Sequence, residues 1–488
     1  MRQIGPMPKR PALVLFRDDL RLADNPALET AAASGVPLLC VFIRDETSPG
    51  IRPLGGAARW WLHYSLVALA AALEERGAAL HVLAGPTVDL VAALAESVDA
   101  GAVFWNRRYG KAEQAADAAL KRALSASGRT AASFNARLLH EPWTVKTAAG
   151  TPFRVFTPFW RATRALGAPA LPRPAPKRLE AAAWPMGGPP ALAVDELGLL
   201  PRRPDWAGGL RQAWQPGEAG ATARLVAFLD HDLDGYALGR DRPDLTHVSA
   251  LSPHLRFGEI SPRQVFHAVH TAELSGAAQG RDAEKFLAEL GWREFCHHLH
   301  FQFPDLDRKN VQPRFDDFPW RTGAERDLTA WQRGLTGLPL VDAGMRQLWQ
   351  TGTMHNRVRM VAASFLAKDL MIDWREGEAW FWDTLCDADA ASNPANWQWV
   401  AGCGADAAPY FRIFNPVKQG ETHDPAGSYV RRFVPELAAL PDKWIHRPFE
   451  APPAVLAQAG VTLGETYPVP IVDRSLSRRR ALEAFAAI

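Results

Sequence analysis

The sequence predicts an α/β domain with a Rossmann-like parallel sheet, followed by an all-helical domain, with a long proline-rich linker between them. In the first 135 residues, short apolar runs alternate with segments of helical length, the pattern of a parallel sheet covered by helices on both faces. Nine prolines lie between Pro169 and Pro204, so this stretch cannot form a regular helix. Beyond about Ala219, apolar residues recur at three- and four-residue spacing almost to the end.

The α/β domain is expected over residues 10–135. Four apolar runs bounded by turn residues are its expected strands, namely 12–16, 36–43, 79–83 and 102–105. Three segments of helical length are its expected helices, namely 25–33, 57–76 and 111–125. No GxGxxG motif follows the first strand, so the usual fingerprint of a nicotinamide-binding domain is absent.

The linker is expected over residues 136–218 and the helical domain over residues 219–488. Two long stretches of the helical domain, 283–303 and 344–371, have the clearest helical periodicity. No internal repeat is visible in the sequence.

Composition narrows the class of protein further. The 488 residues are 47% hydrophobic and 22% charged, which excludes a disordered chain. The net charge of +2 excludes an overall coat of positive charge, although a local basic patch would suffice to bind nucleic acid. No apolar run approaches the roughly 20 residues that a membrane span needs. Neither a signal core in residues 1–9 nor a CxxC pair among the four cysteines is present, which favours a cytoplasmic location.

Candidate functional residues first occur in the stretch EKFLAELGWREFCHHLHFQF. Glu289, Trp292, Arg293 and Cys296 share one helix face by their spacing. Two interpretations remain open: an ion pair between Glu289 and Arg293 beside a core tryptophan, or a cavity wall with a flat surface and a carboxylate. Three histidines follow within four residues, but they fan around the helix, so no metal site is expected.

A second group of candidates combines an arginine with two carboxylates. Arg359 lies in a segment that continues into an apolar run, so it is expected to point inward and to need an acidic or ligand partner. Asp387 and Asp389, in an otherwise uncharged stretch, are the candidate partners, and a salt bridge from Asp387 is favoured over a metal site. Ser249 and Ser252 flank a helix start, where hydroxyl and N–H groups suit phosphate, although an ordinary helix cap explains them equally well.

Together these stretches resemble the photolyase/cryptochrome family of flavoproteins, from Leu13 to about Asp473. The resemblance is carried in order by FRDDLRLADNPAL, LSPHLRFGEISPRQV, ELGWREF, PLVDAGMRQL, TGTMHNRVRM, DLMIDWREGE, CDADAASNPANWQW and PYFRIFNPVKQGE. It implies an N-terminal antenna domain and a C-terminal helical domain that binds FAD in a folded, U-shaped conformation. It is closest to bacterial enzymes that repair cyclobutane pyrimidine dimers, and Thr353 and the CDAD sequence hint at the class III group.

Carried over by position, the resemblance implies a set of FAD-binding residues, namely Tyr236, Ser249, Leu251, Ser252, Trp292, Arg293, Asn356, Arg359, Asp387, Asp389 and Asn393. Arg359 and Asp387 would form an ion pair at the edge of the isoalloxazine ring, and Asn393 would face flavin N5. Asn393 resembles repair enzymes, whereas plant cryptochromes typically have Asp. Val248 departs from the family, which often has Thr at this position.

The resemblance also implies catalytic and DNA-binding residues. The catalytic set is Glu289, Asn356, Met360 and Asn393. The DNA-binding set is Arg240, Glu289, Trp292, Arg357, Trp399, Arg412, Lys418 and Gln419. Met360 resembles enzymes specific for cyclobutane dimers, because 6-4 photolyases have a proton-donating His in that helix. A flipped-out dinucleotide would stack on Trp292 and Trp399 and contact Glu289.

Trp320, Trp374 and Trp397 match the family's electron relay, and Glu113 aligns with an acid that contacts a folate antenna in some members. Those members have an Asn next to this acid, whereas this sequence has Ala112. Methenyltetrahydrofolate is therefore the favoured antenna pigment, and deazaflavin is the alternative. The implied reaction is light-driven electron transfer from reduced FAD to a cyclobutane dimer in UV-damaged DNA by a monomeric enzyme. One alternative is a blue-light receptor that signals through a partner. Another is a light-independent flavin reductase, although the sequence contains no nicotinamide-binding motif to support it.

Overall fold

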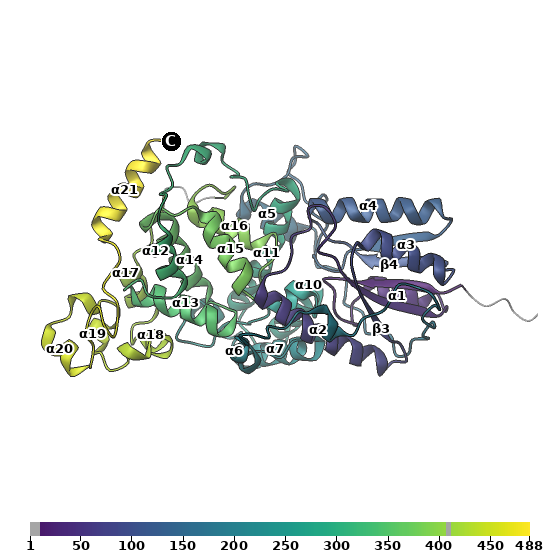
Figure 1. Ribbon diagram of the computed structural model, residues 1–488, viewed down its shortest axis with the longest axis horizontal. Helices are drawn as coiled ribbons and strands as arrows, with labels where there is room; N and C mark the ends of the chain where they lie inside the picture. Colours follow the sequence, from purple (N-terminus) through teal and green to yellow (C-terminus); the bar gives the residue numbers. More distant parts are fainter. Residues whose placement is uncertain (1–9, 407–410) are drawn as a thin grey trace, which may run out of the picture.

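The computed structural model describes residues 10–406 and 411–488. The first nine residues, in which no signal core is expected, and Pro409 and Tyr410 of the last family motif lie outside the described residues. Figure 1 shows an α/β domain at one end of the molecule and a helical domain at the other, so the predicted architecture is confirmed.

Five parallel strands form one sheet in the order β3-β2-β1-β4-β5. The strands are β1 (Ala12–Phe16), β2 (Leu38–Arg44), β3 (Leu80–Ala84), β4 (Ala102–Asn106) and β5 (Thr130–Phe134). The first four were predicted, with ends that differ by one or two residues. The prediction missed β5 because this edge strand reads TAASF and is only half-buried, so it lacks a run of large apolar residues.

Both faces of the sheet are buried, which explains the continuous apolar strands. Val14 and Phe16 of β1 pack on one face, and Leu13 and Leu15 pack on the other. The helices of this domain are α1 (Pro26–Ala33), α2 (Gly56–Glu74), α3 (Thr87–Ser97) and α4 (Lys111–Ala126). Of these, α3 was not predicted, although Val91, Leu94 and Ala95 form an apolar stripe at helical spacing.

The proline-rich segment is ordered and packs against the sheet of the α/β domain. Ala181 pairs with Leu38 of β2, and Leu192 pairs with Val82 of β3, so the segment follows the edge of the sheet. Three helical elements lie within residues 136–218, namely α5 (Phe156–Ala165), the 3-10 helix η1 (Val194–Leu197) and α6 (Gly208–Ala213). Since α5 packs against a helix of the helical domain, the segment also belongs to that domain's core.

The rest of the chain is helical, as predicted. The elements before residue 352 are α7 (Glu218–His231), α8 (Tyr236–Gly239), α9 (Ser252–Phe257), α10 (Pro262–Leu274), α11 (Gly280–Gln302), η2 (Pro313–Asp317), α12 (Glu325–Gln332) and α13 (Pro339–Thr351). Those after it are α14 (Asn356–Ser364), η3 (Phe365–Asp369), α15 (Trp374–Thr384), α16 (Ser392–Ala401), α17 (Pro416–His423), α18 (Ser428–Phe433), η4 (Pro435–Leu437), α19 (Asp442–Ile445), η5 (Pro448–Glu450), α20 (Pro453–Gln458) and α21 (Arg474–Ala486).

The expected helix at 283–303 is present as part of α11, but the expected continuous stretch at 344–371 is wrong. It is divided by Gly352, whose φ of 65° ends α13 in the left-handed conformation that favours glycine. The segment η3 then follows α14 as a π-helical turn. The break lets α14 begin afresh at His355, whose side chain accepts from the Arg357 N–H.

The two domains pack directly on each other. Helix α2 of the α/β domain contacts α7 and α15 of the helical domain. Trp382 of α15 donates its indole N–H to the carbonyl oxygen of Pro53 at 2.9 Å, and the Gly56 N–H donates to Asp383 at 2.7 Å. Within residues 10–406 and 411–488, no helix combines the length and the apolar character needed to cross a membrane.

Candidate functional site

The expected salt bridge between Arg359 and Asp387 is present. Arg359 lies on α14 and donates to both oxygens of Asp387, at 3.1 and 2.9 Å, while its Nε donates to the carbonyl oxygen of Met354 at 2.7 Å. The Asp387 side chain is 7% exposed and that of Arg359 is 25% exposed. Asp387 also accepts from the Ser252 hydroxyl at 2.6 Å, which joins the start of α9 to the arginine.

The start of α9 presents its polar groups to open space. Ser252 is exposed although its neighbours Leu251 and Pro253 are buried, and Ser249 is half-buried. Between them, Ala250 adopts a φ of 51°, a left-handed conformation that is uncommon for alanine. The turn therefore brings the Ser252 hydroxyl to Asp387, while the Ser249 hydroxyl accepts the Leu251 N–H at 3.4 Å.

Asp389 is buried in the turn before α16. It accepts the backbone N–H groups of Ala391 and Ser392, at 2.8 and 2.7 Å. Burial alone would raise the pKa of this carboxyl, but His297, the Ser392 N–H, Arg293 and Arg256 together outweigh burial and lower the pKa to about 2. Asp389 is thus an ionised acceptor at neutral pH.

Asn393 follows on α16 and is held by the neighbouring helix α15. Its Nδ2 donates to the backbone oxygen of Glu378 at 3.0 Å and to Oε1 of Glu378 at 2.8 Å. The Glu378 carboxylate, 3% exposed, is paired in turn with both terminal nitrogens of Arg52, at 2.8 and 2.9 Å. The sequence analysis missed Arg52 and Glu378, because 326 residues separate the two.

The ion pair considered between Glu289 and Arg293 does not form. Glu289 instead pairs with Arg240, from the end of α8, and with Lys285 at 3.3 Å. Arg293 donates to the carbonyl oxygen of Arg137 at 2.8 Å and to Glu294 at 3.3 Å. Glu289 and Arg293 therefore face different parts of the molecule. Along α11, Glu289 lies beside the end of α8, and Arg293 lies against Arg137 of the segment 136–218.

Trp292 is a rigid, partly exposed platform. Its ring stacks on Phe156 of α5 with a centroid distance of 3.8 Å and an interplanar angle of 10°. Phe156 was not a candidate, because it lies in the segment assigned to the linker. On α14, Asn356 is exposed and its Nδ2 lies 3.9 Å from the sulfur of Met360, which is half-buried. Tyr236 is buried, with Arg240 placed 5.7 Å from its ring centroid.

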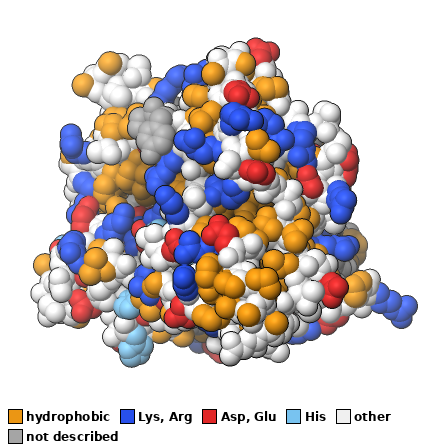
Figure 2. All heavy atoms as spheres, turned by 90° about the vertical axis from the view of Figure 1, so that its left-hand side faces the viewer, with side chains coloured by type: hydrophobic (Ala, Val, Ile, Leu, Met, Phe, Trp, Pro, Cys, Tyr) orange, Lys and Arg blue, Asp and Glu red, His pale blue; other side chains and the backbone are white. Residues whose placement is uncertain are grey.

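The basic residues expected to bind DNA differ in whether they already form ion pairs. Arg357 is paired with Asp241 at 2.6 Å, and Arg240 with Glu289. Arg412 and Lys418 are exposed and form no ion pair within the described ranges 10–406 and 411–488. Gln419 and Trp399 are half-buried, and Oε1 of Gln419 lacks a hydrogen-bond partner in the part of the chain that the structure describes. Figure 2 shows Lys and Arg side chains mixed with hydrophobic ones over the end of the helical domain.

The three expected relay tryptophans differ in burial. Trp397 on α16 is 2% exposed, its indole N–H has no hydrogen-bond partner among residues 10–406 and 411–488, and its ring packs edge-on against Phe381 with a centroid distance of 5.0 Å. Trp374 at the start of α15 is fully buried and donates to Asn310 at 3.0 Å. Trp320 is partly exposed and packs beside the same core. The trio therefore includes two buried indoles and one that reaches solvent.

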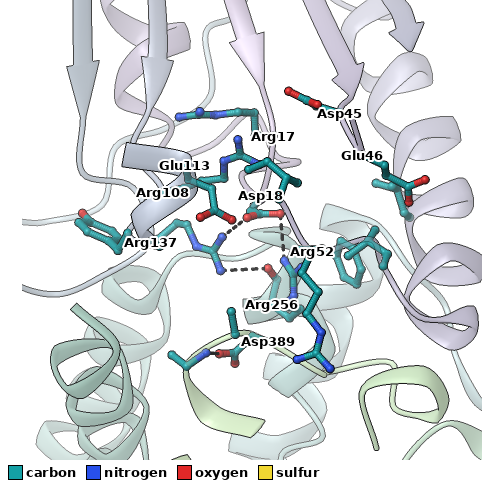
Figure 3. Close-up of a pocket in the computed structure, with 18 of the residues that line it drawn as sticks. Arg17, Asp18, Asp45, Glu46, Arg52, Arg108, Glu113, Arg137, Arg256 and Asp389 are labelled. Atoms are coloured by element: carbon teal, nitrogen blue, oxygen red, sulfur yellow. Dashed lines mark hydrogen bonds and ion pairs between the residues drawn. The ribbon is translucent and has the colours of Figure 1, made fainter. Parts of the chain in front are cut away.

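A separate cavity lies where the carboxyl ends of the parallel strands meet the helical domain. Figure 3 shows its charged lining, in which Asp18 is paired with Arg137 and with Arg256 at 2.9 Å. The cavity encloses about 1070 Å³ of space free of protein atoms, part of it open to solvent. Glu113, Asp389 and Arg52 all line it. Ligands of open α/β sheets bind at this edge, so the cavity is a candidate binding site.

Arg108 is the most unusual group in this cavity. Burial lowers the pKa of its guanidinium, and within the described part of the chain it forms no ion pair within 4 Å. His297 and His300, which also line the cavity, are both buried, and each has one ring nitrogen that forms no hydrogen bond with any described residue. An unpaired cation and two unsatisfied donors or acceptors are suited to a polar, anionic ligand. In the sequence, Asp18 was noted only as part of FRDDLRL, one of the motifs that carry the family resemblance.

The residues around Arg359 fit FAD. Among the described residues, the donors and acceptors with no protein partner, or with room for a second one, include the hydroxyl of Ser249, the amide of Asn356 and Oδ1 of Asn393. A flavin dinucleotide presents phosphates, hydroxyls and an amide edge, which need hydroxyl and N–H donors, a cation and ionised carboxylates. All of these are present in one region of the helical domain.

A parallel α/β domain followed by a helical domain with this site defines a two-domain flavoprotein. The family model described as DNA photolyase matches residues 12–177, and that described as the FAD binding domain of DNA photolyase matches residues 286–487. The chain belongs to the photolyase/cryptochrome family, as the sequence motifs predicted.

Individual relatives include both branches of the family. A deoxyribodipyrimidine photo-lyase of Agrobacterium fabrum is 52% identical over 98% of both chains. Cryptochrome-1 of Arabidopsis thaliana is 38% identical over 97% of this chain and 70% of its own length. The crystal structure of a bacterial class III photolyase from Agrobacterium tumefaciens matches with a TM-score of 0.95 and 51% identity, covering 100% of this chain and 99% of that one.

Proposed function

We propose that this protein is a photolyase that repairs cyclobutane pyrimidine dimers in DNA by light-driven electron transfer. Similarity to a deoxyribodipyrimidine photo-lyase over nearly the full length of both chains supports the enzyme class. The observation that carries the proposal is Asn393, a neutral amide tied to the ion-paired Glu378. An amide at flavin N5 has no acidic proton to give, so it suits a flavin that must remain an electron donor.

In this proposal the cofactor supplies the electron, and the protein positions the lesion. When it is bound and excited by blue light, reduced FAD supplies the electron that splits the cyclobutane ring. The flipped-out lesion would lie against Trp292, which is kept rigid by its stacking on Phe156. Glu289 would accept hydrogen bonds from the bases, and Met360 would fill the wall with a flexible apolar side chain.

The test is repair of an oligonucleotide containing one thymine dimer under blue light, with a dark sample and a 6-4 photoproduct as controls. The wild type should repair the cyclobutane dimer and not the 6-4 lesion, because Met360 cannot donate the proton that the 6-4 lesion needs. The Glu289→Ala variant should lower both affinity and repair yield, since a hydrogen-bond acceptor for the lesion is lost. Efficient 6-4 repair, or undiminished yield in Glu289→Ala, would contradict these roles.

A second candidate function is supported by the similarity to Cryptochrome-1, which spans 97% of this chain. In that case the protein would be a blue-light receptor without repair activity. The same assay separates the two functions: absence of both repair activities in a protein that binds FAD would favour the receptor.

DNA binding is expected to depend strongly on salt, because Lys and Arg contacts to phosphates release counterions. Lys418 is the clearest contact to test, since it is exposed and free of carboxylate partners in the part of the chain that the structure describes. Lys418→Ala should reduce the slope of log K against log salt by about 0.9 for duplex DNA. Arg357→Ala should also reduce it, but less, because Arg357 is already paired with Asp241.

The measurement is fluorescence anisotropy of a labelled, dimer-containing duplex at several salt concentrations. Lys121→Ala is a matched control, since this lysine lies on α4 of the α/β domain and donates to Ser133. A slope in Lys418→Ala equal to that of the wild type would remove Lys418 from the phosphate contacts.

The cavity at the sheet edge is the proposed site of an antenna pigment. Glu113 and the unpaired Arg108 are its most suitable polar contacts. A reduced folate carries a pterin with N–H donors and a glutamate tail with carboxylates, so methenyltetrahydrofolate is favoured over deazaflavin for this lining. A monomeric state, a cytoplasmic location and the domain limits at residues 135 and 218 remain predictions.

A further inference from the structure

The orientation of the Asn393 amide is determined by its partner on α15. Both hydrogens of Nδ2 are used, one by the backbone oxygen and the other by the carboxylate of Glu378. Oδ1 points the other way and accepts no hydrogen bond from any residue in the described ranges 10–406 and 411–488. The oxygen end of the amide is therefore the end left for a ligand.

The Glu378 carboxylate is held in place by a residue of the other domain. Arg52 lies in the loop between β2 and α2, and its two terminal nitrogens bind the two carboxylate oxygens. Its guanidinium also stacks 4.0 Å from the ring centroid of Trp382, whose indole N–H holds the neighbouring carbonyl oxygen of Pro53. Arg52 is thus fixed in position, with 30% of its side chain exposed against 3% for Glu378.

An ionised carboxylate can only accept hydrogen bonds, so it must meet the NH₂ end of an amide. Without Arg52, the Glu378 carboxylate would lose the two hydrogen bonds that hold it opposite Asn393, and it would be left buried without a cation. A Glu378 side chain that turned away would release Nδ2, and the amide of Asn393 could then rotate by half a turn. The Arg52–Glu378 pair therefore selects between two orientations of the same amide.

We propose that Arg52 is a positioning residue that, through Glu378, holds the oxygen of Asn393 toward the flavin. The inference rests on the proposed function only in placing Asn393 at flavin N5. An oxygen at this point accepts from the N–H that N5 carries in the reduced flavin, whereas an NH₂ group would donate to the bare N5 of the oxidised flavin. The Arg52–Glu378 pair therefore favours the reduced state that repair requires.

The expected effect is a shift of the redox equilibrium of bound FAD. Loss of one hydrogen bond corresponds to a change of about three- to tenfold in the ratio of reduced to oxidised flavin at a fixed potential. Arg52→Gln should therefore move the midpoint potential in the negative direction, and Arg52→Lys, which keeps the charge, should restore most of it. A variant that merely loosened the domain contact would not be rescued in this way.

A double-mutant cycle tests whether Arg52 acts through Glu378. Glu378→Gln should shift the potential in the same direction as Arg52→Gln, because the amide has a donor that can meet Oδ1 of Asn393. On the Glu378→Gln background, Arg52→Gln should then add nothing. Asp383→Ala is the matched control, since it removes another contact between α15 and the α/β domain, the one with Gly56, and leaves Glu378 untouched.

The potentials are measured by spectroelectrochemistry of purified protein reconstituted with FAD alone, because Arg52 also lines the interdomain cavity. An unchanged potential in Arg52→Gln, a full additional shift in the double variant, or an equal shift in Asp383→Ala would each overturn the proposal. Failure of the proposed function would look different, since the wild type would then bind no FAD or repair no dimer.

Discussion

Replacing Arg359 with alanine should remove most of the affinity for FAD. Asp387, whose side chain is 7% exposed in the intact pair, would lose both charge-assisted hydrogen bonds and its only cation partner in the described part of the chain. Breaking a buried pair in this way costs about 3 kcal/mol at the lower end of the usual range, which applies because Arg359 is a quarter exposed. That cost corresponds to a loss of about 100-fold in affinity if it falls on the bound state.

The measurement is a titration of the flavin-free protein with FAD, followed by tryptophan fluorescence. Arg359→Lys should keep part of the affinity, since an ammonium retains the charge but cannot form the paired hydrogen bonds. Arg346→Ala is a suitable control, because Arg346 forms a similar ion pair with Glu436, at 2.8 Å, elsewhere in the same domain. Unchanged FAD binding in Arg359→Ala would show that the pocket assignment is wrong.

Replacing Trp397 with phenylalanine should strongly slow the light-driven reduction of bound, oxidised FAD. An indole is easily oxidised and a phenyl ring is not, so the first step of the expected relay would be lost. The fold should tolerate the change, because the Trp397 N–H has no hydrogen-bond partner to lose within the described ranges and the ring packs in an apolar environment beside Phe381 and Trp331. Repair should persist when the FAD is reduced chemically before illumination.

Photoreduction is followed by flavin absorbance under blue light with an external reductant. Trp331→Phe provides the control, since Trp331 is fully buried and is not an expected relay residue. Its ring centroid lies 6.2 Å from that of Trp397. Trp374→Phe should resemble Trp397→Phe. Normal photoreduction in both relay variants, or equal slowing in Trp331→Phe, would mean that the electron takes another route.

Local patterns in the sequence predicted the elements whose environment is uniform. The strands β1 to β4 are buried on both faces, so their apolar runs identify them. Edge strand β5 and the break at Gly352 escaped prediction, because a half-buried TAASF has no distinct pattern and a single glycine within an apolar periodicity does not require a break.

Within the site, the salt bridge between Arg359 and Asp387 was predictable for the same kind of reason. An arginine in an apolar segment needs a partner, and few carboxylates occur in an uncharged stretch that could supply it. The partner of Glu289 was not predictable. Helical spacing allowed Arg293, but the chain placed Arg240 closer, and side-chain choice among several cations depends on distances that only packing defines.

The sequence by itself therefore determined the two-domain architecture, the family and the residue types available at the candidate site. These follow from periodicity and from motifs, which are properties of short segments. Only the tertiary structure decided how the domains are coupled: Arg52 meets Glu378 across 326 residues, and Glu378 orients Asn393. Such contacts join groups that are distant along the chain, so their free energy depends on burial and geometry that no local pattern contains.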